Sequence, residues 1–250
     1  MLEPKVSPVY PRAPIIESVI ELRMRGEIGV RDVEKIATRL GKRYEFSELQ
    51  NVVDVGVIAT GSGVTLHQQA RGGRRLFSSD QANVAIVNQR SLVTACLPPY
   101  QGWNAFCADA RKNFQDWKKV DKSFAIERIG VRYVNRIDIP SGVQDLVQLE
   151  KYFTIYPGMS TYERPLLGFL VQATVNGHLT DWAATITVAP FEPALVPDHV
   201  SILLDIDAYR TSNIPHKDED LWRVVTEGQA IKNDLFERTL TPAAKRLFSK

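Results

Sequence analysis

The sequence has little of several features on which a functional assignment usually rests. Its 250 residues include only four histidines, which are scattered and form no HxH or HExxH pattern. No GxSxG, GxGxxG or Walker A motif is present. No apolar run approaches the roughly 18 residues that a membrane-spanning helix needs. We therefore expect no membrane partner, and the sequence predicts no catalytic residue, no metal ligand set and no cofactor.

The sequence also has few cysteines and a small net charge. The two cysteines, Cys96 and Cys107, lie in apolar patterns typical of buried thiols in a reducing compartment, so we expect a cytoplasmic protein. The chain carries 31 basic and 29 acidic side chains, a net charge of +2. Whole-chain attraction to nucleic acid needs a much larger excess, so a nucleic-acid partner is not favoured.

One long stretch, Phe124–Pro140, does carry a strong pattern. Its residues alternate between apolar and polar over more than a dozen positions, which predicts a half-buried strand. The apolar face consists of Ile129, Val131, Tyr133, Ile137 and Ile139. We expect this face to be covered, with Tyr133 and Ile129 largely buried, while the opposite face meets water or a partner.

The rest of the chain predicts further strands and helices after a proline-interrupted arm at residues 1–13 that packs poorly over residues 1–10. The expected strands are Ile15–Arg25, Val52–Ala59, Val64–Ala70, Val84–Asn88, Leu92–Leu97, Leu166–Val175, Asp181–Val188 and Val200–Tyr209. The expected helices are Val30–Lys42, Gln101–Trp117, Val143–Phe153, Lys217–Glu237 and Thr241–Phe248. Hairpin-linked strands followed by helices favour an α+β fold.

The predicted architecture is an antiparallel sheet covered on one face by long helices, within a single domain at 14–250. The order strand, helix, several strands, helix occurs twice, so two β-α-β(3-4)-α halves at 14–120 and 124–250 stay an alternative. This order is similar to helix-grip and saddle-like folds, although a fold does not fix a function. The aromatic stripe Trp103, Phe106, Phe114 and Trp117, with Trp222, is expected in the core.

The candidate site is the polar face of the predicted sheet. Arg128, Arg132 and Arg136 stand on one face of the central strand, at intervals of about 13 Å. Asp205 and Asp207 have the matching parity on the strand Val200–Tyr209. The face is either a solvated surface with cross-strand ion pairs, or a binding groove whose arginines meet an anionic or acidic partner.

We predict in either case that Arg128 or Arg132 forms an ion pair with Asp205, Asp207, Glu17 or Glu21. A metal or acid–base role for the two aspartates is not favoured, because no histidine or third carboxylate stands at ligand spacing beside them.

Two basic segments are weaker candidates. Arg71–Arg75, with two glycines between its arginines, predicts a glycine-rich turn with solvated side chains. Lys118, Lys119 and Lys122 form a second basic patch. Contact with phosphates is the alternative for both segments.

Several motifs together resemble an uncharacterised, sporadically distributed bacterial protein family. The motifs are PIIE at Pro14, RLFSSD at Arg75, PPY at Pro98 with Trp103 and Phe106, RIGVRYVNRI at Arg128, LLDID at Leu203, and Trp222 followed by KNDLFERTLT at Lys232. The likeness covers nearly the whole chain and implies a bacterial origin and a single domain of conserved length. It transfers no activity, cofactor or catalytic residue.

The sequence thus favours a non-enzymatic bacterial binding or interaction protein that acts through its mixed-charge sheet face, on an unknown protein or anionic ligand. Self-association into a homo-oligomer stays open. One alternative is a small-molecule binder with an apolar cavity between sheet and helices, lined by Trp103, Phe114 and Trp222. A weaker alternative is an enzyme on a phosphate-bearing substrate.

Overall fold

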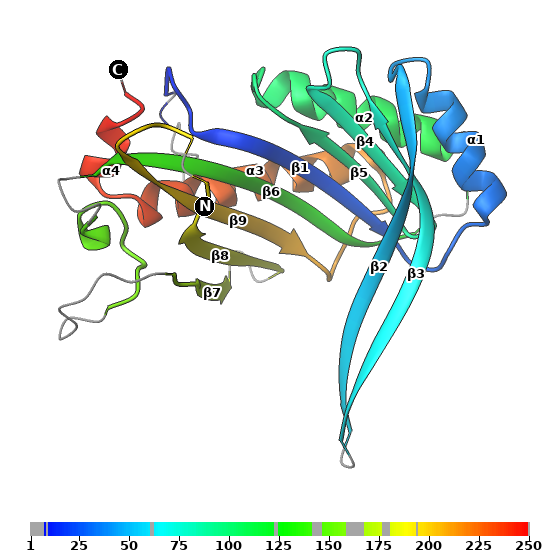
Figure 1. The fold of residues 1–250 in the computed structure, drawn as a ribbon. Helices are drawn as coiled ribbons and strands as arrows, with labels where there is room; N and C mark the ends of the chain where they lie inside the picture. Colours follow the sequence, from blue (N-terminus) through cyan, green and yellow to red (C-terminus); the bar gives the residue numbers. More distant parts are fainter. Residues whose placement is uncertain are drawn as a thin grey trace. The chain divides into compact units, whose positions relative to one another are not determined.

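The computed structural model describes residues 8, 10–60, 63–122, 125–141, 147–158, 168–176, 181–193 and 195–249, with side chains described outside 51–71. The fold is mixed α+β (Figure 1). Its strands are β1 (Ile15–Met24), β2 (Phe46–Thr60), β3 (Gly63–Phe77), β4 (Asn83–Asn88), β5 (Ser91–Cys96), β6 (Ile126–Pro140), β7 (Val171–Asn176), β8 (Trp182–Pro190) and β9 (His199–Arg210). Its helices are α1 (Val30–Leu40), α2 (Trp103–Lys118), α3 (Asp218–Thr239) and α4 (Pro242–Arg246).

The strands form one antiparallel sheet in the order β2-β3-β4-β5-β1-β6-β9-β8-β7. The chain divides into two compact units, which are described separately below. Unit 1 comprises residues 1–18 and 130–250, and unit 2 comprises residues 19–129. Strands β1 and β6 each contribute residues to both units.

In unit 2, α1 and α2 pack on the hairpin strands and on each other. The predicted stripe of α1 is buried, through Val33, Ile36, Ala37 and Leu40. In α2, the core residues include Phe106, Phe114 and Trp117. Trp103, in contrast, is only half-buried, so its predicted burial was wrong. It is the first residue of the helix, and its ring packs edge-on against Phe106 rather than under the helix.

The β2–β3 hairpin is longer than predicted and extends past the ends of β4 and β5 as a twisted ribbon (Figure 1). The predicted turn at Arg71–Arg75 lies inside β3, so that prediction was wrong. Gly73 pairs with Gln50 on one side and with Asn88 on the other. A Cβ at Gly73 would lie 2.8 Å from the carbonyl oxygen of Val87. The glycine therefore serves a close approach between strands.

In unit 1, β6 shows the predicted alternation, and Tyr133 is 2% exposed. Helix α3 packs on this part of the sheet. Its buried side follows Leu221, Val225, Gly228, Lys232 and Phe236, while Ile231 and Leu235 are only half-buried. A Cβ at Gly228 would lie 2.4 Å from the ring of Trp182. The absence of a side chain at Gly228 thus allows α3 to lie close to the indole ring of Trp182 in β8.

Two predicted elements of unit 1 differ from the structure. Over residues 147–153 the predicted helix is replaced by a single 3-10 turn at Leu149–Lys151, and residues 142–146 lie outside the described part. The backbone there bonds instead to the end of α3 and to the N-cap of α4, because Thr154 N donates to Thr239 O and Thr241 N donates to Tyr152 O. The strand predicted from Leu166 begins at Val171, with 168–170 irregular and 166–167 outside the described residues.

The predicted arm at residues 1–13 also needs a correction. Residues 1–7 and 9 lie outside the described part of the chain. Tyr10, however, packs its ring against Phe236 and Phe248, and its hydroxyl donates to Glu237 at 2.9 Å. Arg12 N donates to Phe248 O. The arm is therefore attached to the C-terminal helices of unit 1 from Tyr10 onward.

Candidate functional site

The polar sheet face of unit 1 is built by strand register. Gln172 of β7 lies opposite Thr187 of β8, which lies opposite Asp205 of β9. Gln172 Nε2 donates to Thr187 Oγ1 at 3.0 Å. Arg132 of β6 then donates from Nε and Nη2 to the two oxygens of Asp205, at 2.8 and 2.7 Å. A continuous polar row therefore crosses four strands and ends in a bidentate ion pair.

A second row runs beside the first. Thr174 and Thr185 share a hydroxyl contact of 3.3 Å, and Thr185 lies opposite Asp207. Hydrogen bonds to Asp205 raise the pKa of Arg132 above its ordinary value, burial opposes them, and the charges of Asp205, Asp207 and Glu17 add to the rise. One guanidinium is therefore surrounded by three carboxylates.

The other predicted site arginines lie in different surroundings. Arg136 pairs with Asp138 of its own strand at 3.1 Å, and Ser201 Oγ donates to Asp138 at 2.6 Å. Arg128 pairs with Glu21, and both residues belong to unit 2. The predicted ion pairs are thus confirmed for Arg128 and for Arg132.

The five predicted site residues do not form a single arginine-lined groove. In unit 1, the face carries four carboxylates (Glu17, Asp138, Asp205 and Asp207) against two guanidiniums, Arg132 and Arg136. Its local charge is therefore negative, and its arginines already have acidic partners. The alternation of side chains along each strand places these groups on one face. It does not predict that acidic side chains outnumber basic ones around Arg132.

The aspartates show no arrangement for metal or acid–base chemistry. Both oxygens of Asp205 accept hydrogen bonds from Arg132, so this carboxylate already has a partner at each oxygen. Within the described residues, no group of three or more histidine, cysteine or acidic side chains stands close enough to hold a metal ion. Cys96 and Cys107 are buried free thiols whose pKa is raised by burial, as expected for apolar filling residues.

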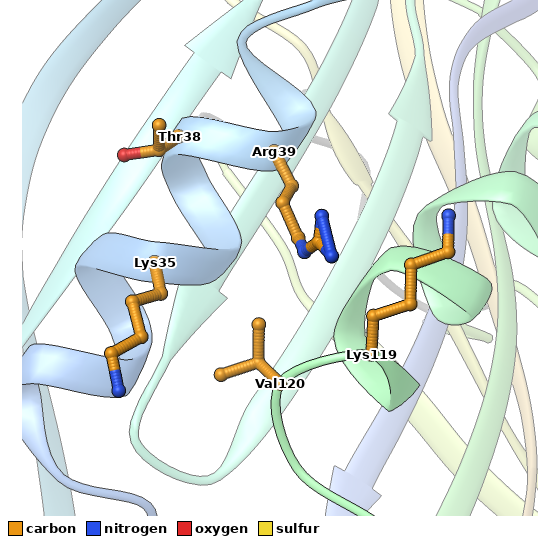
Figure 2. A pocket seen from close by; sticks show the side chains of 5 residues that line it. All are labelled: Lys35, Thr38, Arg39, Lys119 and Val120. Carbon is orange, nitrogen blue, oxygen red and sulfur yellow. The ribbon is translucent and has the colours of Figure 1, made fainter.

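Unit 2 contains a basic hollow that the sequence analysis only partly identified. It measures about 450 Å³ and is lined by Lys35, Thr38 and Arg39 of α1 and by Lys119 and Val120 after α2. Figure 2 shows Arg39 extending from α1 toward Val120, with Lys119 on the other side. The sequence does contain one indication of this hollow. Arg31, Lys35 and Arg39 are four residues apart, which places them on one face of a helix.

Unit 1 also buries a charged side chain that the sequence analysis missed. Lys232 is 7% exposed, and its Nζ lies 3.7 Å from the ring centre of Tyr133. Burial lowers the pKa of Lys232 to about 7, and the charge of Glu237 opposes this shift. Glu237 itself accepts from Tyr10 and pairs with Lys245 at 2.8 Å. The cluster joins both ends of the chain around one carboxylate.

Comparison with protein-family models finds no match, and comparison with curated proteins finds no significantly similar sequence. The resemblance to a bacterial family therefore stays a prediction. Among the described residues, no helix is both long and apolar enough to cross a membrane.

Proposed function

We propose that the protein is a non-enzymatic binding protein whose polar sheet face in unit 1 receives a partner protein. The main support is the pair of polar rows, the first of which crosses β7, β8, β9 and β6 and the second β7, β8 and β9. Threonines and short polar side chains give this face hydrogen-bonding groups without bulk. Such groups suit the polar rim and flat contact area of a protein–protein interface.

The charge of the face favours a basic partner surface. The bidentate pair neutralises Arg132, and Asp207 and Glu17 add negative charge around it. An anionic ligand at this place would have to displace Asp205 from a charge-assisted, two-bond contact. A lysine or arginine of a partner would instead complement the excess carboxylates, which would raise the association rate and fix the orientation.

The alternatives have less support. Among the described residues that line the basic hollow of unit 2, Val120 is the single apolar one, whereas small-molecule sites are mostly apolar. Phe114 and Trp222 are each closely buried in their own unit. We retain as part of the proposal a helix-grip or saddle-like form of the fold, which α2 and α3 support by their lengths of 16 and 22 residues.

Site-specific photocrosslinking in the native host tests the proposal. A benzophenone amino acid at Thr185, on the polar face, should give discrete crosslinked protein species. The same group at Ala230, which is exposed on α3 of the same unit, is the matched control and should not give those species. Asp207→Lys should remove the Thr185 crosslinks while circular dichroism stays unchanged.

Absence of discrete crosslinks from Thr185, or crosslinks that persist unchanged in the Asp207→Lys protein, would contradict the proposal. Crosslinks between two copies of this chain would identify the partner as a second subunit.

A further inference from the structure

The nearly neutral net charge of the chain hides a strong segregation of charge. Unit 2 contains 17 of the 31 basic and 12 of the 29 acidic side chains, which gives it +5. The remaining 14 basic and 17 acidic side chains give unit 1 a charge of −3. The weak overall charge was the reason for not favouring nucleic acid, and this reason does not hold for unit 2 taken by itself.

The positive charge of unit 2 is concentrated in two segments. Residues 30–43, which contain α1, carry five basic and two acidic side chains. Residues 115–122, at the end of α2, carry three basic and two acidic side chains. Lys35 and Arg39 from the first segment and Lys119 from the second line one hollow of about 450 Å³ (Figure 2). The basic hollow therefore joins the two segments into one cationic band.

The acids near this band leave its cations available. Lys35 pairs with Asp32, and Lys119 with Asp116, but the lysine side chains are 66% and 57% exposed. An exposed pair such as Lys35–Asp32 contributes only about 0–1 kcal/mol and is readily exchanged for another anion. Asp116 is 10% exposed, whereas its partner Lys119 extends to the surface. Asp116 also accepts from Arg43. In the described part of the chain, Arg39 has no acidic partner, and it extends into the hollow.

We propose that the cationic band of unit 2 binds the phosphate backbone of a nucleic acid, with Lys35, Arg39 and Lys119 as its central contacts. Lysine and arginine are the main side chains that contact phosphates, and such contacts carry no base sequence information. None of the described lining residues is aromatic, so these residues provide no ring on which a base would stack, and we expect binding without sequence preference.

A polymer fits the band better than a small phosphorylated molecule does. The cations continue beyond the hollow in the chain, to Arg31 and Lys42 on one segment and to Lys118 and Lys122 on the other. A single phosphate ester would engage only the lining residues, whereas a backbone with regularly spaced phosphates can engage the flanking cations as well.

Fluorescence anisotropy with a labelled random-sequence DNA duplex of about 20 base pairs tests the proposal, at salt concentrations between about 50 and 200 mM. The full-length protein should bind at low salt and weaken steeply as salt increases. The Arg39→Glu/Lys119→Glu variant should lose at least about tenfold in affinity, and its salt slope should fall by about two. The Arg39→Lys/Lys119→Arg variant should keep both.

The matched control is Arg223→Glu/Arg238→Glu on α3, where both side chains are exposed and each pairs with an acid about one turn away. It makes the same change in net charge and should bind within about twofold of the unchanged protein. Equal loss in this control, or no binding of the unchanged protein at about 50 mM salt, would overturn the proposal. Competition by polyglutamate as strong as that by DNA would also overturn it, in favour of an acidic protein.

Discussion

The two units fix their helices on the sheet by opposite means. In unit 2, Asn113 of α2 is fully buried and donates to Tyr44 at 2.8 Å and to Thr94 at 2.9 Å, while Arg43 donates to it at 2.7 Å. In unit 1, α3 relies on the missing side chain of Gly228. A buried polar network specifies one arrangement by its hydrogen bonds, whereas a close apolar contact specifies it by shape.

The units differ in the sign of their charge as well. Unit 2 carries its excess cations on α1 and at the end of α2, and unit 1 carries excess carboxylates on its sheet face. One chain thus carries two surfaces of opposite charge. The comparison also shows that a similar order of strands and helices does not imply similar packing or similar function.

The largest expected effect is on the core of unit 1. Tyr133→Ala should lower the free energy of unfolding by about 3–5 kcal/mol, because it removes a buried aromatic side chain. Urea denaturation measures this loss. Tyr209→Ala, at a half-buried position of β9, is the control and should cost clearly less. A loss below about 1 kcal/mol for Tyr133→Ala would mean that the stability of unit 1 does not depend on the packing of Tyr133 in its core.

The second effect depends on pH. The folded-state pKa of Lys232 is about 7 against an ordinary 10.5, so the unfolded chain binds the extra proton between these values. Stability should therefore rise as pH increases from 7 to 10.5, and the cost of the buried amine is fully present below pH 7. Lys232→Met should stabilise the protein by about 2–4 kcal/mol at neutral pH, since the ring of Tyr133 offsets part of the cost.

The gain from Lys232→Met should shrink toward pH 10, which denaturation curves across the pH range measure. Lys112→Met, which replaces a lysine whose side chain is 56% exposed, is the control and should give no such gain. A gain that does not change with pH would show that Lys232 acts through packing alone.

The third effect tests the network of unit 2. Asn113→Ala leaves the hydroxyls of Tyr44 and Thr94 and the guanidinium of Arg43 without a shared partner, and should cost about 1–3 kcal/mol. Amide hydrogen exchange should accelerate in α2 and β5 but not in α3. Asn104→Ala, at an exposed position of the same helix, should change neither. Faster exchange confined to α3 would contradict this localisation.

The smallest effect is expected at the sheet face. Arg132→Ala should change stability by less than about 1 kcal/mol, because the arginine side chain is 46% exposed and its pair with Asp205 is solvated. Thermal unfolding measures this change. A loss of several kcal/mol would mean that the ion pair is structural, and it would weaken the proposal that this face binds a partner.

The sequence predicted elements whose pattern is local. The alternation of β6 and the buried stripe of α1 could be recognised because each is visible in the spacing of apolar residues along a single segment. The helix predicted at Val143–Phe153 was wrong over 147–153. The apolar spacing is compatible with a helix, but Thr154 bonds to the end of α3 and Tyr152 bonds to Thr241, and these tertiary bonds favour a non-helical backbone.

Features that depend on partners far along the chain were harder to predict. The glycine pair after Arg71 has the composition of a turn, and only the pairing of Gly73 with two strands shows its role. The alternation of side chains along β6 and β9 placed Arg132 and Asp205 on one face of the sheet. The excess of carboxylates around Arg132 depends on how the strands are aligned with one another. The basic hollow needs two segments separated by about eighty residues of sequence to meet.

The attachment of Tyr10 and Arg12 to the last helices bears on the order in which the protein matures during synthesis. Unit 2 is one contiguous segment, so all of its residues have left the ribosome before most of unit 1 has been translated. Residues 10–18 emerge before unit 2, yet Tyr10 and Arg12 bind Glu237, Leu247 and Phe248, which are translated after it. The contacts of Tyr10 and Arg12 can therefore form only after residues 237–248 have been synthesised, so unit 1 is completed later than unit 2.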